Sequence, residues 1–353
     1  MGSIAAVGPA AATGPATAAA PPLGVTTCAR TGVLRPSTRY STGEYVCVAL
    51  ASTSPPIPTF ARAALRDPHW LAAMQEKFDA LQHYRTWHLV PRPPRANVIT
   101  GKWVFRHKTR QDGSLERYKA RWVVCEFRHR AGVDFTITFA PVVKLGMIRT
   151  VLQLAVSRAW PVHQLDVSNA FLHGHLAEQV FCEQPTSFVD LAHPDFVCLL
   201  SRSLYGLKQA PQAWYQRIAA FLQSLGFRST RSNTSLFVYH QGVDTAYLLL
   251  YVDDIILTAS APELLQRLMA RLRYEFALKD LGPLHYFLGI EVVRRADGFF
   301  LHQQKYTHEL LERAGMLNCK PAPTPVDTKA KVSALEGSLV SDATFYCSIV
   351  GAL

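Results

Sequence analysis

The sequence predicts a mixed fold of the α/β (α+β) class with an antiparallel sheet at its centre. Short apolar runs on either side of a tight polar turn predict β-hairpins, as at residues 247–252 and 255–258. Amphipathic segments between the hairpins predict helices packed on the sheet, as at 212–225 and 262–276. Because the two strands of a hairpin run antiparallel, we expect an antiparallel central sheet.

Composition and charge limit the possible functions. With 353 residues, 49% of them hydrophobic, the chain is long enough for two domains with a sizeable core. The net charge is +11, and residues 85–130 alone hold twelve Lys or Arg against three acids, with six aromatic residues among them. Such a segment predicts binding of a polyanion, either a nucleic acid backbone or a triphosphate. The alternative is a solvated basic face without a ligand.

Several classes of protein are disfavoured. The seven cysteines are odd in number and form no CxxC, which argues against a disulfide framework or a zinc module and favours a reducing compartment. His173 and His175 have no further ligand at metal spacing, so a loop is expected there. No apolar run reaches the length of a membrane span, so no membrane partner is expected. Residues 1–60, rich in Ala, Pro and Gly, predict a disordered linker and not a signal peptide.

The first half of the ordered chain predicts a helix, a hairpin and a second helix. Asp67 and Pro68 are an N-cap and a first-turn residue for a helix over 67–84. Its expected inward residues are Trp70, Leu71, Met74, Phe78 and Leu81. Strands over 102–108 and 117–124 flank an Asp-Gly turn at 112–113, so the basic residues decorate a small antiparallel sheet. A helix over 147–158 follows, with Ile148, Val151, Leu152 and Ala155 inward.

The second half alternates in the same way. A strand is predicted over 162–167, then the helix over 212–225 with Gly226 as its stop. The hairpin at 247–258 and the amphipathic helix over 262–276 come next. A further hairpin is predicted from 286–293 and 298–302, and a final helix over 305–315. Residues 321–325 are expected to be irregular and extended.

Asp253 and Asp254 are the most informative residues of the chain. Two adjacent carboxylates between apolar strands repel each other and are costly to bury unless water or cations solvate them. Asp166, near the end of the 162–167 strand, supplies a third carboxylate. Three convergent carboxylates on strands suit a two-metal site for phosphoryl transfer. The alternative for the pair alone is a plain polar turn, since Asp is a common turn residue.

Nine short motifs then carry a resemblance to a known family. They are KWVF (102–105), RYKAR (117–121), TFAPVVK (138–144), QLDVSNAFLHG (164–174), SLYGLKQAP (203–211), YVDD (251–254), KDLG (279–282), YFLGIEV (286–292) and KPAPTP (320–325). The chain resembles the reverse transcriptase region of copia-type LTR retrotransposon polyproteins over about residues 65–353. Each motif alone is weak, but nine in order are specific.

The resemblance implies a right-hand polymerase with palm, fingers and a partial thumb. The fingers would be about 65–160 and 176–205, and the palm about 161–175 and 206–295. Residues 296–353 would begin a thumb or connection, and the copy would be truncated, since FYCSIVGAL at 345–353 resembles a motif that continues into further domains. The first 60 residues resemble the tail that follows an integrase, as in elements that carry out DNA integration.

The resemblance also implies roles for individual residues. Asp166, Asp253 and Asp254 would be catalytic and hold two Mg²⁺, with Mn²⁺ as a possible substitute; Asp254 is the least certain direct ligand. The implied nucleotide-binding residues are Lys119 and Arg121 for the phosphates, Gln209 over the sugar and Phe171 as a steric gate against a ribose 2′-OH. Phe287, Leu288 and Gly289 would belong to a primer grip. Charged strand faces and a simple core aromatic are the alternatives for Lys119, Arg121 and Phe171.

The implied reaction is RNA-directed DNA polymerisation, in which a dNTP is added to the 3′-OH of a DNA primer on an RNA template. A cytoplasmic virus-like particle is the expected location, and the nucleus is a second one. A two-metal nuclease is a poor alternative, because it would not share the RYKAR and LKQAP motifs.

A catalytically inactive, nucleic-acid-binding remnant of a decayed element is the main alternative. Four residues depart from the family pattern: Glu126 and Ser187 stand where Gly is expected, Gln212 where Arg is, and Asn233 where Asp is. One G-to-A change in a codon produces each of these, so we hypothesise decay by cytosine deamination. The same residues in the DNA of sibling copies would refute that hypothesis.

Overall fold

A computed structural model describes residues 55–110, 114–125, 129–130, 132–135, 138–295, 298–320 and 340–352. The described chain divides into two units, of which the larger ends at Lys305 and the smaller begins at Tyr306. The predicted linker therefore lies outside the described residues except for 55–60, as do the Asp112-Gly113 turn, Glu126 and the 321–325 segment.

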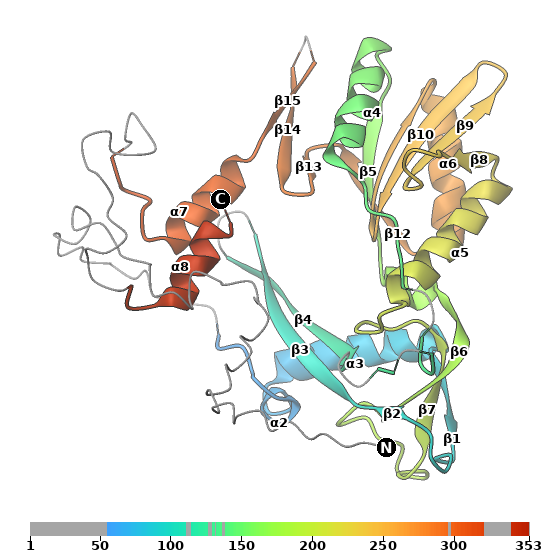
Figure 1. Cartoon of the computed structure of the whole chain (residues 1–353), viewed down its shortest axis with the longest axis vertical. Helices are drawn as coiled ribbons and strands as arrows, with labels where there is room; N and C mark the ends of the chain where they lie inside the picture. The colour runs from blue at the N-terminus through green and yellow to red at the C-terminus, as the bar shows by residue number, and fades with distance from the viewer. Residues whose placement is uncertain are drawn as a thin grey trace, which may run out of the picture. The chain divides into compact units, whose positions relative to one another are not determined.

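A six-stranded sheet is the centre of the larger unit (Figure 1). Its strands, in spatial order, are β12 (Leu278–Pro283), β5 (Val162–Val167), β11 (Asp254–Ala259), β10 (Asp244–Tyr251), β9 (Leu236–Gln241) and β8 (Phe227–Ser229). Every neighbouring pair is antiparallel. The prediction of an antiparallel central sheet is confirmed, and the strands from the Asp253-Asp254 hairpin lie in its middle.

Helices cover both faces of this sheet. On one face, α5 (Ala210–Ser224) and α6 (Pro262–Glu275) bury Trp214, Leu222 and Leu268 against the strands. On the other face, α4 (Leu145–Ser157) buries the four residues that its periodicity predicted. Apolar burial of this kind stabilises by about 25 cal/mol per Å². Helices therefore cover the sheet on both faces. Helix α4 packs on it, although α4 lies within residues 65–160, which the family resemblance assigns to the fingers.

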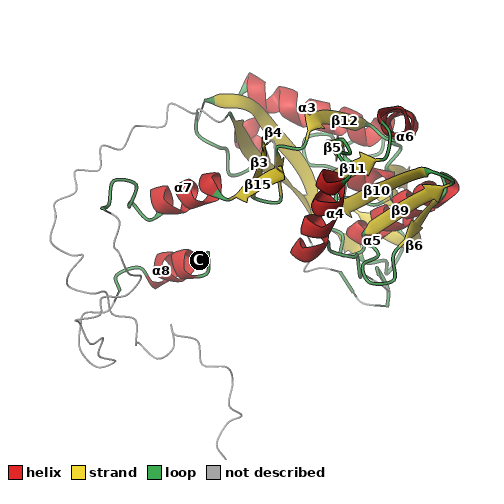
Figure 2. Cartoon of the chain, turned by 90° about the horizontal axis from the view of Figure 1, so that it is seen from above, coloured by secondary structure: helices red, strands yellow, loops and turns green. Residues whose placement is uncertain are grey.

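A second layer packs around another core. It contains α2 (Ala61–Ala64), α3 (Pro68–His83), the β3–β4 hairpin (Gly101–Thr109 and Leu115–Val124) and a four-stranded sheet. The strands of that sheet, in spatial order, are β1 (Trp87–Val90), β7 (Val197–Arg202), β6 (His175–Cys182) and β2 (Val98–Ile99). Helix α3 packs beside β4, as Figures 1 and 2 show from two directions. A 3₁₀-helix, η3 (Ala170–His173), follows β5, so the expectation of a loop at His173 and His175 is wrong.

Helix α3 illustrates where a helical pattern misleads. The Asp67 carboxylate accepts hydrogen bonds from the backbone N–H groups of His69 and Trp70, which confirms the predicted cap. Leu71, however, is 39% exposed, so its predicted inward position is wrong. The residues that α3 buries are Trp70, Met74, Lys77 and Leu81. A lysine therefore occupies a place in the apolar stripe.

The predicted strand over 286–293 is two strands. β13 (Tyr286–Phe287) and β14 (Ile290–Arg295) pair with each other across a two-residue turn, and β15 (Gly298–His302) pairs with β14. Leu288 and Gly289 both have positive φ, 50° and 79°, which is the conformation of the tight hairpin turns that match strand twist. Glycine is the residue that adopts this conformation without strain, and it marks the turn in the sequence.

The smaller unit contains most of α7 (Gln304–Arg313) and α8 (Ala343–Val350). The Asp342 carboxylate caps α8 by accepting a hydrogen bond from the Phe345 backbone N–H at 2.9 Å. The Tyr306 hydroxyl donates to the Ala352 carbonyl oxygen and links the two helices. No helix among the residues described is both long and apolar enough to span a membrane.

Candidate active site

Asp253 lies in a two-residue turn of the central sheet. The register pairs Tyr251 with Asp254, so Val252 and Asp253 form the two-residue turn and Asp254 already belongs to β11. Val252 has φ of 53°, which a β-branched residue adopts only when its surroundings impose it. The prediction that both aspartates lie on the turn is thus correct for Asp253 and wrong for Asp254.

Two hydrogen bonds hold the turn in place. The backbone N–H of Val167, next to Asp166, donates to the Asp253 carbonyl oxygen at 2.8 Å. The indole Nε1 of Trp214, from α5, donates to the Val252 carbonyl oxygen at 2.6 Å. The first bond ties the turn to the end of β5, and the second ties it to the helix behind the sheet. The positions of Asp166 and Asp253 are therefore fixed by backbone geometry.

The ionisation of Asp166 and Asp254 is opposed by burial and by the neighbouring carboxylates. Burial raises the pKa of Asp166, and the Asp253 carboxylate raises it further. Burial, Asp253 and Asp166 raise the pKa of Asp254 to about 6, against a smaller opposing effect of the Gln164 side chain. Asp166 and Asp254 are direct cross-strand partners, which explains their coupling. A cation placed between these groups would relieve the repulsion.

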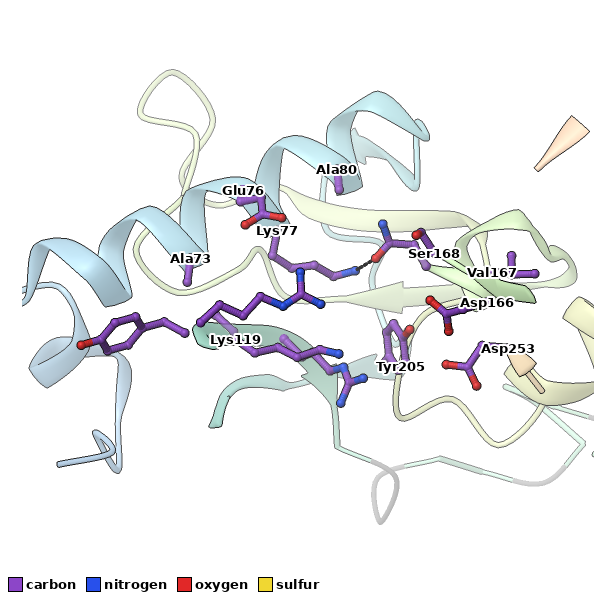
Figure 3. Close-up of a pocket in the computed structure, with 15 residues that line it drawn as sticks. Ala73, Glu76, Lys77, Ala80, Lys119, Asp166, Val167, Ser168, Tyr205 and Asp253 are labelled. Atoms are coloured by element: carbon purple, nitrogen blue, oxygen red, sulfur yellow. Dashed lines mark hydrogen bonds between the residues drawn. The ribbon is translucent and has the colours of Figure 1, made fainter. Parts of the chain in front are cut away.

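Asp166 and Asp253 line a cavity of about 210 Å³. Figure 3 shows their carboxylates together at one end of it, with Tyr205 beside them. Asp254 is outside the lining. We call Asp166 and Asp253 the acidic side of the cavity. The structure thus brings two of the three predicted carboxylates into the same space and leaves the third at its edge, as a cross-strand neighbour of Asp166.

Lys119 and Arg121 line the same cavity from β4. The pKa of Lys119 is lowered by burial and by the positive charges of Arg121 and Arg117, with a smaller opposing effect of Asp166. The Arg121 guanidinium lies 5.2 Å from the centre of the Tyr205 ring, a cation–π distance. Both predicted phosphate-binding residues therefore face the carboxylates.

The loop before α5 brings Tyr205 to this position. The Val124 backbone N–H donates to the Tyr205 carbonyl oxygen at 2.9 Å, so the loop pairs with the end of β4. Gly206 has φ of 93°, and a Cβ there would lie 2.1 Å from the Val124 carbonyl oxygen. Only glycine allows this close approach. Tyr205 is consequently held under Arg121.

Phe171 and Gln209 lie outside the cavity lining. Phe171 is on η3, where its ring meets the Tyr205 ring edge-on at 4.9 Å, and Tyr205, unlike Phe171, lines the cavity. Gln209 is buried at the start of α5, and its Nε2 donates to the Asp134 carbonyl oxygen at 2.7 Å. The roles of both residues toward a nucleotide stay predictions.

The predicted primer-grip residues lie at the hairpin between β13 and β14, with Leu288 and Gly289 in its turn and Phe287 at the end of β13. Phe287 is buried in the core under the sheet, on the side covered by α4. Leu288 and Tyr251 line a separate apolar cavity of about 480 Å³. This turn therefore lies near the tip of the Asp253 hairpin, and its role toward a primer stays a prediction.

Lys77 and Tyr205 line the cavity as well, and sequence reasoning did not single out either. The sequence does hold a signal for Lys77, because 70, 74, 77 and 81 fall on one helical stripe and three of the four are apolar. Tyr205 has no such signal, since its position depends on the pairing of its loop with β4. We call Lys77, Lys119 and Arg121 the basic side of the cavity.

The residues of the acidic side fit a divalent cation. Across the described parts of the chain, no group of three or more His, Cys, Asp or Glu side chains is arranged as a metal site. The available donors are the carboxylates of Asp166 and Asp253, with Asp254 next to them. Hard cations such as Mg²⁺ prefer oxygen ligands and bind through one or two carboxylates plus substrate phosphates. Such an ion would offset the burial and the carboxylate repulsion that together raise the pKa of Asp166 and Asp254.

The cavity therefore combines carboxylates at one end with cations along another side. Carboxylates that hold divalent cations activate an attacking oxygen, and cations bind phosphates. The combination is typical of the class of proteins that act on phosphate esters by metal-assisted transfer.

Comparison with known families agrees with this class. Residues 84–328 match the model of the family described as reverse transcriptase (RNA-dependent DNA polymerase), and the chain belongs to that family. The copia-type resemblance seen in the motifs is confirmed.

Two of the similar proteins are polyproteins from plant transposons, of which this chain matches a part. Over 328 residues, 93% of this chain, it is 44% identical to the retrovirus-related Pol polyprotein from transposon RE1 of Arabidopsis thaliana. Over 84% of the chain it is 39% identical to the corresponding polyprotein from transposon TNT 1-94 of Nicotiana tabacum. In both cases it spans 22% of the relative's length. Among solved structures, an apo telomerase from Candida tropicalis matches 66% of this chain and 60% of its own at 9% identity, with a TM-score of 0.30, too low to establish a shared fold.

Proposed function

We propose that this chain catalyses RNA-directed DNA polymerisation, the transfer of a nucleotide from a dNTP to the 3′-OH of a DNA primer on an RNA template. One observation carries the proposal: in a chain of the reverse transcriptase family, Asp166 and Asp253 line one cavity together with Lys119 and Arg121. Carboxylates for metal and cations for phosphate are the two requirements of phosphoryl transfer.

Each side of the cavity has a separate task in this mechanism. Asp166 and Asp253, with Asp254 as their neighbour, would hold two Mg²⁺ or Mn²⁺ ions. Bound there, the ions would lower the pKa of the primer 3′-OH and neutralise charge on the triphosphate and the leaving pyrophosphate. Lys119 and Arg121 bind the phosphates, and Arg121 can do so with two parallel hydrogen bonds. The Trp214 indole keeps the Asp253 turn rigid, so the carboxylate does not move during the reaction.

The parts of the fold take their names from the same proposal. The six-stranded sheet with α5 and α6 would be the palm, and α3 with the β3–β4 hairpin would be fingers. The Leu288-Gly289 turn would be the primer grip, because it lies beside the Asp253 hairpin. The unit that begins at Tyr306 would be the start of a thumb. A primer–template of RNA and DNA would be the macromolecular partner.

Primer extension tests the proposal. The purified chain is given an RNA template with a DNA primer, dNTPs and Mg²⁺ or Mn²⁺, next to an Asp253→Asn, Asp254→Asn double variant. Extension by the chain that disappears in the variant supports both the activity and the carboxylate assignment. An absence of extension while the primer–template is still bound contradicts the proposed activity.

That second outcome corresponds to a decayed copy, and two observations favour it. Ser187, with φ of 81°, is the third residue of a turn closed by the Phe188 N–H on the Pro185 carbonyl, where glycine is preferred. Asn233 accepts a hydrogen bond from the Ser235 N–H, but its buried Nδ2 has no partner among the described residues. An aspartate has no such donor to leave unpaired. Extension restored by Glu126→Gly would assign the loss to that substitution.

A further inference from the structure

Lys77 is a buried cation in the cavity that none of the family motifs includes. It is 8% exposed, although lysine is almost never buried without a partner. Its place on α3 puts it across the cavity from the β4 cations, and Figure 3 shows its ammonium reaching toward the end where Asp166 lies. Its neighbours on α3 along the lining are Ala73, Glu76 and Ala80. The small alanine side chains leave the space that the lysine enters.

Two contacts fix the position of the ammonium group. Nζ donates to the Oδ1 of Asn169 at 2.7 Å, and it lies 5.1 Å from the centre of the Tyr205 ring. Asn169 itself has a left-handed backbone, with φ of 54°, which asparagine tolerates better than most residues. An ammonium group has three N–H donors, and the Asn169 amide accepts one of them. Two neutral groups, the Asn169 amide oxygen and the Tyr205 ring, therefore hold the Lys77 ammonium group in place.

The surroundings of Lys77 are electrostatically unfavourable without a ligand. Burial and the positive charges of Arg121 and Lys119 together lower the pKa of Lys77 to about 8, against a smaller opposing effect of Glu76. The two cations Lys77 and Arg121 approach the same Tyr205 ring. In the part of the chain that the structure describes, no ion pair forms at Lys77, Lys119 or Arg121. With Arg117, which also lines the cavity, four like charges are thus assembled around it.

A polyphosphate would resolve this arrangement. It carries several negative charges, accepts hydrogen bonds at many oxygens and favours the charged form of each cation that it meets. We propose that Lys77 binds the triphosphate of the incoming nucleotide, as a cation from α3 opposite Lys119 and Arg121 of β4. This inference rests on the proposed function and adds to it a phosphate-binding residue from α3. Tyr205 and Asn169 act as positioning residues that hold Lys77 at the site.

Binding of inorganic triphosphate, measured by calorimetry, tests the assignment without requiring catalysis. Lys77→Met keeps the length and apolar stem of the side chain and is expected to weaken triphosphate binding about tenfold or more, since hydrogen bonds to charged groups contribute about 1.5–3 kcal/mol. Lys77→Arg is expected to stay within about threefold of the unmodified chain. Arg271→Met removes one positive charge from an exposed position on α6, outside the cavity, and is expected to have no effect. Equal binding by Lys77→Met and the unmodified chain would overturn the inference.

A second measurement does not depend on a variant that folds. The unmodified chain is acetylated at pH 7.5 with a small amine-reactive acetylating reagent, with and without saturating triphosphate. Labelled peptides are quantified by mass spectrometry. Bound triphosphate is expected to protect Lys77 at least fivefold and to leave the exposed Lys102 unchanged. Equal labelling of Lys77 with and without triphosphate would contradict the inference.

Kinetics distinguish this inference from the proposed function. If the chain extends primers, Lys77→Met should raise KM for the dNTP about tenfold and change KM for the primer–template little. A purely structural role would lower the thermal stability and affect both substrates. If the chain binds triphosphate through Lys77 but extends no primer, the inference holds and the proposed function fails.

Discussion

The acidic and basic sides of the cavity are built in different ways. Asp166 lies at the end of a strand, and Asp253 lies in a turn. Hydrogen bonds from the central sheet and from the Trp214 indole to backbone carbonyl oxygens of this turn hold it in place. The basic side consists of long side chains from α3 and from β4, which belongs to a two-stranded sheet. Its order depends on side-chain contacts with Tyr205 and Asn169. Under the proposed function, the side held by the sheet would perform the chemistry and the side built from long side chains would bind the substrate.

The difference between the acidic and basic sides predicts that changes on each side affect different kinetic constants. A change on the acidic side should lower kcat, because the metal-binding oxygens act in the transition state. A change on the basic side should raise KM for the dNTP. The following experiments test the division, from the largest effect to the smallest.

Asp166→Asn should have the largest effect. It removes a cavity carboxylate but keeps the side-chain shape, so we expect kcat for primer extension to fall at least about a thousandfold, in line with the loss of a group that stabilises the transition state by several kcal/mol. Asp254→Asn should reduce kcat less, since Asp254 lies outside the cavity lining. Single-turnover extension measures both. Equal losses in the two variants would contradict the geometric distinction between them.

Arg121→Met should have the next largest effect. It removes a guanidinium from the basic side, so KM for the dNTP should rise about ten- to a hundredfold with a smaller change in kcat. Steady-state kinetics at varied dNTP concentration give both constants. Arg271→Met, on the surface of α6, is the control for the loss of one charge. A loss confined to kcat would show that Arg121 belongs functionally with the carboxylates.

The pH dependence of stability tests the electrostatic cost of ionising Asp254 next to the acidic side of the cavity. The pKa of Asp254 is raised to about 6, so its ionisation destabilises the metal-free folded state. That penalty is complete above pH 6 and disappears as the pH falls toward the ordinary value of about 4. In EDTA, Asp254→Asn should therefore melt about 2 °C higher than the unmodified chain at pH 7.5, and the difference should vanish near pH 4. Thermal denaturation monitored by circular dichroism measures it.

A control and a metal titration complete this test. Asp195→Asn changes an exposed carboxylate on a loop and should shift the melting temperature little at either pH. Added Mg²⁺ should stabilise the unmodified chain more than the Asp254→Asn variant. A variant that is less stable than the unmodified chain at pH 7.5 would contradict the electrostatic explanation.

Ser187→Gly should have the smallest effect and lies outside both sides of the cavity. It relieves a left-handed φ in the turn closed between Pro185 and Phe188, at the expense of a more flexible unfolded chain. We expect a gain of about 0.5–1 kcal/mol in the free energy of unfolding, with kcat and KM unchanged. Urea denaturation measures the gain. A lower stability would show that Ser187 is suited to its turn, and it would weaken the hypothesis of decay.

The sequence by itself determined part of the strands, most helices and the family. Periodicity located β5, β10, β11 and α6, because apolar stripes report directly on which face is buried. The motifs identified Asp166, Asp253, Lys119 and Arg121, and all four line the cavity.

Only the tertiary structure decided the rest. Asp254 falls in a strand because register, which depends on pairing across the sheet, sets which residues form the turn. The tight turn at Leu288 and Gly289 divides a run that periodicity presents as one strand. Tyr205 reaches the cavity because its loop pairs with β4, a contact between segments far apart in the chain. In the sequence, Lys77 is a charged residue within an apolar stripe and has no evident partner. The fold places Asn169 and Tyr205 around it, and such neighbours are what allow a charge to be buried.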